Sequence, residues 1–177
     1  MPLTADVQTP HLVLGGAKSG KSTFAETLVK AFPAPHVYIA TAQVLDEEMA
    51  HRVRIHRLRR EKSWETIESP LDLVPTLRAC QGRQQAVLVD CITLWLSNLL
   101  LQTPTQRPEE AVGELVEFIR TVPFPLILVA NEVGGGIVPD NSLARRFRDL
   151  AGLANQRLAA VCPAVTLVIA GLPLRLK

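Results

Sequence analysis

A glycine-rich segment near the start of the chain constrains its fold more than any other feature. It reads Gly15-Gly16-Ala17-Lys18-Ser19-Gly20-Lys21-Ser22 and matches the phosphate-loop pattern G-x4-G-K-S/T, in which backbone N–H groups turn towards phosphate oxygens. The apolar run His11–Leu14 precedes it, and a helical pattern over Ser22–Ala31 follows it. The helix N-terminus adds a favourable partial positive charge at the phosphates. The sequence therefore predicts that this chain binds a nucleoside triphosphate.

Two side chains of this segment and one acid further along predict a magnesium-bound triphosphate. Lys21 can reach the β- and γ-phosphates, and the Ser22 hydroxyl can ligate Mg²⁺. The apolar run Val87–Val89 closes on Asp90. An acid at the end of such a strand is the usual partner of a phosphate loop and holds Mg²⁺ directly or through water. We therefore expect Ser22 and Asp90 to form the metal site.

Apolar runs alternate with helical patterns along the rest of the chain. Further strands are expected at Val37–Ala40, Trp64–Glu68, Ala86–Asp90, Leu126–Ala130 and 165–170, and further helices at Asp46–Glu61, Leu71–Cys80, Thr93–Leu101, 109–121 and 142–161. Strands alternating with helices predict a mainly parallel sheet covered on both faces. The fold class is therefore α/β, a RecA-like P-loop NTPase fold. We expect residues 11–177 to form one domain, preceded by a flexible leader over 1–10.

Composition narrows the classes of function. Hydrophobic residues make up 47% of the chain, charged residues 20%, and the net charge is only +2, which gives no support to nucleic-acid or membrane binding by bulk electrostatics. The most apolar stretch, 158–174, contains two prolines and is too short to span a bilayer. The three widely spaced cysteines, Cys80, Cys91 and Cys162, form no metal-binding or disulfide pattern. We therefore expect a cytoplasmic protein with reduced thiols.

A histidine lies among arginines in the expected helix over Asp46–Glu61. Arg52, Arg59 and Arg60 lie at i−4, i+3 and i+4 from His56, so all four side chains share one helix face. Nearby cations disfavour a protonated imidazole, and a neutral imidazole among arginines suits attack on a phosphoryl group. The spacing alone also fits a solvated basic helix with an incidental histidine.

Two later segments leave alternatives open. Asn131–Pro139 follows an expected buried strand and contains three consecutive glycines. In such folds ligands bind beyond the carboxyl ends of the strands, yet a plain flexible connection fits the spacing equally well. The helix over 142–161 carries Arg145, Arg146, Arg148 and Arg157 opposite its apolar face, which is typical of solvated charge.

Taken in order, these segments resemble the bifunctional adenosylcobinamide kinase / adenosylcobinamide-phosphate guanylyltransferase family of cobalamin biosynthesis. The resemblance rests on GGAKSGKS at 15–22, YIATAQVLDEEMAHRVRIHRLRR at 38–60, VLVDCITLWLSNLL at 87–100 and NEVGGGIVPDNSLARRFRDLAGLANQRLA at 131–159. A phosphate loop alone is unspecific, whereas its combination with the histidine helix and the NEVGGGIVP loop is specific.

The resemblance implies two activities. The first transfers the γ-phosphoryl group of ATP or GTP to a hydroxyl of adenosylcobinamide. The second moves GMP from GTP onto that phosphate through a guanylylated histidine, which by its position is His56, and releases pyrophosphate. It further implies a corrinoid substrate, a homotrimer, and nucleotide contacts beyond the phosphate loop. Those contacts come from Ala40, Thr41, Ala42, Arg57, Leu58, Arg59, Arg60, Glu68 and Asp90.

Two rivals remain at this level. A simple small-molecule kinase would use the same phosphate loop without a covalent nucleotide intermediate. A nucleotide-dependent switch or DNA-binding ATPase would need a broad basic surface or partner-binding segments, and the net charge of +2 argues against it.

Overall fold

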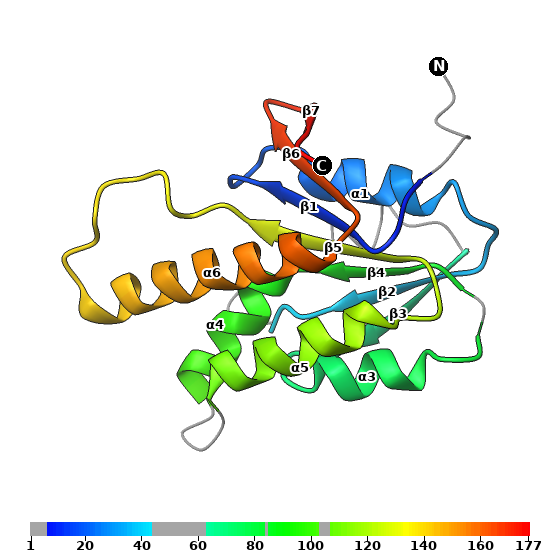
Figure 1. Ribbon diagram of the computed structural model, residues 1–177, viewed down its shortest axis with the longest axis horizontal. Coiled ribbons are helices and arrows are strands. Elements are labelled where there is room, and N and C mark those ends of the chain that lie inside the picture. Colours follow the sequence, from blue (N-terminus) through cyan, green and yellow to red (C-terminus); the bar gives the residue numbers. More distant parts are fainter. Residues whose placement is uncertain (1–6, 44–62, 84, 103–106) are drawn as a thin grey trace.

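Parallel strands form the centre of the molecule in the computed structural model (Figure 1), which describes residues 7–43, 63–83, 85–102 and 107–177. The sheet has seven strands in the order β3-β2-β4-β5-β1-β6-β7, and every pair is parallel except β6–β7. The strands are β1 (His11–Gly15), β2 (His36–Ala40), β3 (Trp64–Glu68), β4 (Val87–Asp90), β5 (Leu126–Asn131), β6 (Ala164–Ile169) and β7 (Leu172–Arg175). The expected mainly parallel sheet is confirmed.

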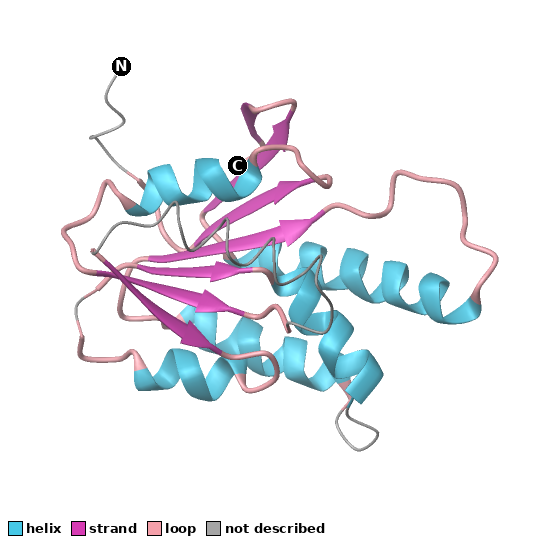
Figure 2. Ribbon diagram, turned by 180° about the vertical axis from the view of Figure 1, so that it is seen from behind, coloured by secondary structure: helices cyan, strands magenta, loops and turns pink. Residues whose placement is uncertain are grey.

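Helices cover both faces of this sheet, as expected. They are α1 (Lys21–Val29), α3 (Leu73–Ala79), α4 (Ile92–Gln102), α5 (Pro108–Arg120) and α6 (Ser142–Val161). Helix α1 lies on one face, whereas α3, α4, α5 and α6 lie on the other (Figure 2). The connection from β1 to β2 moves along the sheet towards β3, whereas the connections that follow β3, β4 and β5 move towards β7. Because such connections are right-handed, the helix between β1 and β2 lies on the opposite face from the other four.

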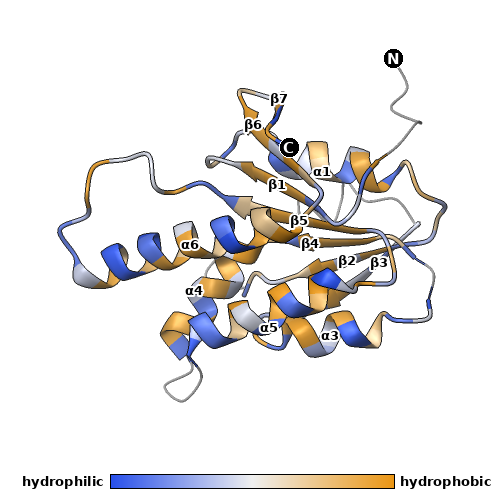
Figure 3. Cartoon of the chain, viewed as in Figure 1, coloured by the Kyte–Doolittle hydropathy of each residue, from blue (hydrophilic) through white to orange (hydrophobic). Residues whose placement is uncertain are grey.

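The central strands are apolar on both sides because each side is covered. Val87, Leu88 and Val89 of β4 are all buried, and β1 is buried throughout. Figure 3 shows the hydrophobic colour of these central strands. Alternate residues join two separate cores: Val13, Leu88, Ile127 and Val129 pack with α1, whereas their neighbours pack with the other four helices. This division shows which side chains at the strand ends share the α1 face.

The last strand was not among those expected from the sequence. Strand β7 pairs antiparallel with β6, and Ile169 lies opposite Leu172. Ala170 and Gly171 join the strands with φ angles of 52° and 79°, the backbone of a type I′ turn, which suits the twist of two hydrogen-bonded strands. The expected strand over 165–170 included Ala170, but this residue belongs to the hairpin turn, and β6 ends at Ile169.

Two expectations fall on residues outside the described part. They are the leader, of which only residues 7–10 are described, and the helix over Asp46–Glu61 with His56. Within the described residues, no helix is long and apolar enough to cross a membrane. The three cysteines are free and buried.

Candidate nucleotide site

The phosphate loop joins β1 to α1, as its sequence pattern requires. Ser19 N–H donates to the Gly16 carbonyl (3.3 Å), and Phe24 N–H donates to the Gly20 carbonyl (3.0 Å), which starts the helix. Lys18 and Gly20 adopt left-handed φ angles of 55° and 94°. The Lys21 side chain, only 9% exposed, bends over the loop, where its Nζ donates to the Gly16 carbonyl (3.1 Å). The loop is thus a compact turn with a lysine ammonium group held above it.

Residues remote in sequence support this loop from the side of β6. A Cβ atom at Gly15 would lie 2.7 Å from the Val168 carbonyl oxygen and 2.4 Å from Ser19 Oγ. Gly171 N–H, in the β6–β7 turn, donates to the Ser19 carbonyl (2.8 Å). Sequence reasoning missed this support, since only the pairing of β6 with β7 brings the turn to the loop.

A second cluster lies at the carboxyl ends of β2 and β4. Tyr38 donates its hydroxyl hydrogen to Asp90 Oδ2 (3.1 Å). The Thr41 hydroxyl donates to the Cys91 carbonyl (2.7 Å) and accepts from Cys91 N–H (2.8 Å), and Asn98 Nδ2 donates to the Thr41 carbonyl (2.8 Å). The backbone after β2 is therefore fastened beside Asp90.

Three expected contact residues lie in one row at this edge of the sheet. Glu68 is in register with Ala40, and Ala40 is in register with Asp90. Glu68 and Asp90 are thus two strand spacings apart, ~10 Å, on the face that carries Tyr38. Ala42 lies just beyond the row, whereas His56 and residues 57–60 lie outside the described residues.

Strand β5 separates the phosphate loop from Asp90. Asn131 is in register with Gly15, and Val129 is in register with Asp90. Glu132 N–H donates to the Gly15 carbonyl (3.1 Å), which ties the end of β5 to the start of the loop. The loop and Asp90 therefore lie two strands apart, and Asn131 lies between them.

The residues expected to hold Mg²⁺ offer the oxygen donors that this ion prefers. Ser22 is half-buried in the first turn of α1, and its hydroxyl has no hydrogen bond to another described residue. Asp90 is also half-buried, and the Tyr38 hydroxyl occupies only one of its carboxylate oxygens. Among the described residues, no three His, Cys, Asp or Glu side chains gather as a metal cage. This donor set fits an ion that takes its other ligands from phosphates and water.

The thiol of Cys91, next to Asp90, is unreactive. Burial raises its pKa to about 12, and the neighbouring Asp90 carboxylate acts in the same direction. The thiol therefore stays protonated at neutral pH and is not a nucleophile.

Packing restricts only the first of the three glycines in the loop over Asn131–Pro139, because a Cβ atom at Gly134 would lie 2.9 Å from Glu132 Oε1. A Cβ atom at Gly135 or Gly136 would have no neighbour within 4 Å. The start of α6 holds the far end of this loop, because Arg145 donates to the carbonyls of Pro139 (2.8 Å) and Asp140 (2.6 Å). Part of the arginine face of α6 thus binds backbone carbonyls, where the sequence indicated solvated charge.

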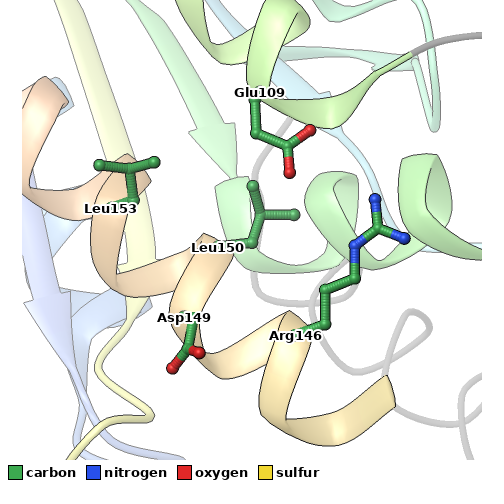
Figure 4. A pocket seen from close by; sticks show the side chains of 5 residues that line it. All are labelled: Glu109, Arg146, Asp149, Leu150 and Leu153. Atoms are coloured by element: carbon green, nitrogen blue, oxygen red, sulfur yellow. The ribbon is translucent and has the colours of Figure 1, made fainter. Parts of the chain in front are cut away.

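A shallow hollow between α5 and α6 is separate from this site. It measures about 410 Å³ and is lined by Glu109, Arg146, Asp149, Leu150 and Leu153. Figure 4 shows the Arg146 guanidinium on one side of it, and Asp149 pointing away from Glu109. None of these residues belongs to the phosphate loop or the Asp90 cluster.

Comparison with known proteins identifies the family of the chain. Residues 11–176 match the family described as cobinamide kinase / cobinamide phosphate guanyltransferase, CobU. The chain belongs to this family. It is 47% identical to the bifunctional adenosylcobalamin biosynthesis protein CobP of Pseudomonas aeruginosa, over 94% of this chain and 96% of the relative. It is 42% identical to CobU of Salmonella typhimurium, over 94% and 98%. The expectation of an enzyme of this family is confirmed.

Solved structures confirm the fold alone. A KaiC-like protein from Pyrococcus horikoshii OT3 matches with a TM-score of 0.51 and 14% identity, covering 89% of this chain and 69% of that one. An ATPase from the type III secretion system of pathogenic bacteria gives a TM-score of 0.54 and 12% identity, covering 93% and 56%. The expected RecA-like P-loop architecture is therefore confirmed.

Proposed function

We propose that this CobU-family chain carries out two consecutive reactions on a corrinoid in cobalamin biosynthesis. In the first, it transfers the γ-phosphoryl group of ATP or GTP to a hydroxyl of adenosylcobinamide. In the second, it transfers GMP from GTP to the phosphate so formed, giving adenosylcobinamide-GDP and pyrophosphate. The family match over residues 11–176 carries this proposal, and the phosphate loop facing Asp90 across β5 supports it.

The phosphate loop has the chemistry that both reactions need. Backbone N–H groups over Gly16–Ser22 and the N-terminus of α1 would hold the triphosphate, and Lys21 Nζ would exchange the Gly16 carbonyl for a phosphate oxygen. Ser22 and Asp90 would hold Mg²⁺, which, when bound, would offset negative charge on the phosphates. Thr41, fastened by Cys91 and Asn98, would fix the contact segment Ala40–Ala42.

For guanylyl transfer we propose His56 as the nucleophile. Its neutral imidazole nitrogen forms a bond to the α-phosphorus of GTP, the bond to the bridging oxygen breaks, and pyrophosphate leaves. A phosphate oxygen of the corrinoid then attacks the phosphoramidate, which transfers GMP and frees the histidine. The arginines at 57, 59 and 60 would offset charge on the phosphates. Thr41, whose hydroxyl is hydrogen-bonded to the backbone of Cys91 next to Asp90, precedes His56 by 15 residues in the sequence.

Labelling tests the covalent step. The protein is incubated with Mg²⁺ and GTP carrying a label on its α-phosphate, and is then denatured. We expect an acid-labile, alkali-stable label on the wild type and on His51→Ala, and none on His56→Ala. His51 is the matched control because it lies in the same expected helix but outside the arginine cluster.

Adding cobinamide and GTP labelled on its γ-phosphate to the same protein separates the rival functions. Phosphorylation of cobinamide without any protein label would indicate a simple kinase and contradict the guanylyl-transfer half. Nucleotide hydrolysis without transfer to cobinamide would contradict both halves and favour a switch or motor ATPase.

We further propose that the enzyme is a cytoplasmic homotrimer that needs neither a nucleic acid nor a membrane partner. The free, buried state of Cys80, Cys91 and Cys162 supports a reducing compartment. The family resemblance supports the trimer.

A further inference from the structure

Asn131 lies at the centre of the site, yet the reactions above give its side chain no role. Its backbone is in register with Gly15 of the phosphate loop on one side. On the other side, β4 places Asp90 opposite Val129, two residues before Asn131. The Asp90 and Asn131 Cα atoms are therefore one strand spacing and two residues apart, ~8 Å. Of the described side chains at the end of β5, that of Asn131 lies between the triphosphate cradle and the metal-binding acid.

The strand alternation gives the direction of this side chain. Ile127 and Val129 pack in the core beneath α1, so Asn131, in phase with them, faces the same side of the sheet. Gly15 is likewise in phase with Val13 of that core, and Asp90 meets Tyr38 there. The carboxamide thus shares its face with both the phosphate loop and Asp90.

Two buried polar side chains hold the backbone of Asn131. Thr93 Oγ1 of α4 accepts from Asn131 N–H (2.6 Å), and Asn155 Nδ2 of α6 donates to the Asn131 carbonyl (3.1 Å). Thr93 and Asn155 are only 5% and 7% exposed. Buried polar groups must be hydrogen-bonded, and here both point at one strand-end residue.

The carboxamide itself remains available. Asn131 is half-buried, and within the described residues its side chain has no hydrogen-bond partner. The backbone of Asn131 is held in place, and its side chain lies between the phosphate loop and Asp90. Such a side chain is pre-organised to bind a ligand.

We propose that Asn131 is a catalytic residue of the kinase step, whose carboxamide N–H donates to an oxygen of the γ-phosphoryl group while it is transferred. Thr93 and Asn155 are its positioning residues. This inference rests on the proposed kinase activity. In that step the corrinoid hydroxyl oxygen forms a bond to the γ-phosphorus, and the bond to the β–γ bridging oxygen breaks. The nucleoside diphosphate leaves, and the hydroxyl proton passes to solvent. A neutral donor fits here because charge on the equatorial oxygens shifts during transfer.

The role predicts a selective defect in Asn131→Ala. Removing one donor to a developing oxyanion costs about 100-fold in kcat, so we expect kcat for cobinamide phosphorylation to fall by about that factor. We expect KM for the nucleotide to change less than about threefold, because the loop supplies most of the ground-state binding. Labelling of His56 from α-labelled GTP should persist, since the γ-phosphoryl group is not transferred there. Asn131→Asp keeps the shape but replaces the donor with a negative charge beside the phosphates, so it should lower kcat at least as much as Asn131→Ala and also raise KM for the nucleotide.

Asn141→Ala provides the matched control. Asn141 caps α6 by accepting from Leu143 N–H and Ala144 N–H, so its loss should lower the melting temperature and leave kcat unchanged. For the positioning residues, Thr93→Val should lower kcat for phosphorylation and leave nucleotide KM in place. Thr93→Ser, which keeps the hydroxyl, should restore kcat.

Binding of ADP with aluminium fluoride, a mimic of the transferred phosphoryl group, makes the test independent of the corrinoid. We expect Asn131→Ala to bind Mg²⁺–ADP–aluminium fluoride at least about tenfold more weakly than the wild type and Mg²⁺–ADP equally well. Equal affinity of both proteins for the mimic, or equal losses for the mimic and ADP, would overturn the role of Asn131. A different result would separate the two proposals. If Asn131→Ala binds the mimic selectively more weakly but the wild type does not phosphorylate cobinamide, the proposed substrate is wrong and the role of Asn131 is supported.

Discussion

Gly15 shows how closely the phosphate loop is packed by residues from elsewhere in the chain. The Val168 carbonyl and the Ser19 side chain occupy the space that a Cβ atom would need. The Val168 carbonyl belongs to the backbone of a buried strand, so moving it away would cost free energy.

Substituting Gly15 should therefore disturb both stability and nucleotide binding. We expect Gly15→Ala to lower the free energy of unfolding by about 1–3 kcal/mol, the usual cost of forcing an extra carbon into a packed site. Urea unfolding of the nucleotide-free protein measures this.

The matched control is Gly152→Ala, in the interior of α6, where an added Cβ would meet nothing within 4 Å. It should raise stability by about 0.5–1 kcal/mol, because alanine loses less backbone entropy than glycine in a helix. Equal stability of the two variants would show that the loop relaxes freely around Gly15.

At the scale of elements, β1 and β6 share a buried polar contact below the phosphate loop. His11 Nε2 lies 2.9 Å from Thr166 Oγ1, and the other ring nitrogen, Nδ1, is also buried. Burial lowers the pKa of His11 from 6.5 to about 4, and the nearby Arg175 of β7 acts in the same direction. A charged imidazole is therefore disfavoured between these strands.

This contact predicts a loss of stability in mild acid. Between pH 6.5 and about 4 the unfolded chain binds a proton at His11 that the folded chain does not. The free energy of unfolding should therefore be fully retained above pH 6.5 and fall as the pH drops, by up to ~1.4 kcal/mol per pH unit from this group. Burial also lowers the pKa of His36, which adds in the same direction.

Urea unfolding of the wild type and His11→Gln at several pH values between 7 and 4 isolates this contribution. Glutamine can still hydrogen-bond to Thr166 but does not titrate, so its stability should fall less steeply over that range. Parallel curves for the two proteins would mean that His11 is protonated equally in both states.

At the scale of the whole molecule, the sequence predicted those features that are determined by residues close together in the chain. Helix α6 and strand β3 have the expected bounds, because an uninterrupted apolar period or alternation marks each. The phosphate loop was equally predictable, since all of its signal lies in one segment. Contacts between distant residues left no such signal: Tyr38 with Asp90, and Thr93 and Asn155 with Asn131. They follow from the strand order, which no local pattern fixes.

The proposed trimer can be tested on the whole molecule. Light scattering coupled to gel filtration should give three times the chain mass of 19.4 kDa. Two exposed apolar residues can be used to locate the interface between copies of the chain. They are Ile137, in the loop before α6, and Leu172, on the edge strand β7. If either lies between copies, its change to Asp should lower the measured mass. A mass of 19.4 kDa for the wild type at assay concentrations would contradict the trimer.

The turn at Gly171 has a consequence for the order in which the enzyme becomes functional during synthesis. The phosphate loop is synthesised before the residues that support it, because the Gly171 N–H that holds Ser19 and the Val168 carbonyl beside Gly15 are added much later. A nascent chain that lacks this hairpin carries the whole loop sequence without its support. Nucleotide capture should therefore begin only when translation of the hairpin is complete, so incomplete chains would not sequester ATP or GTP.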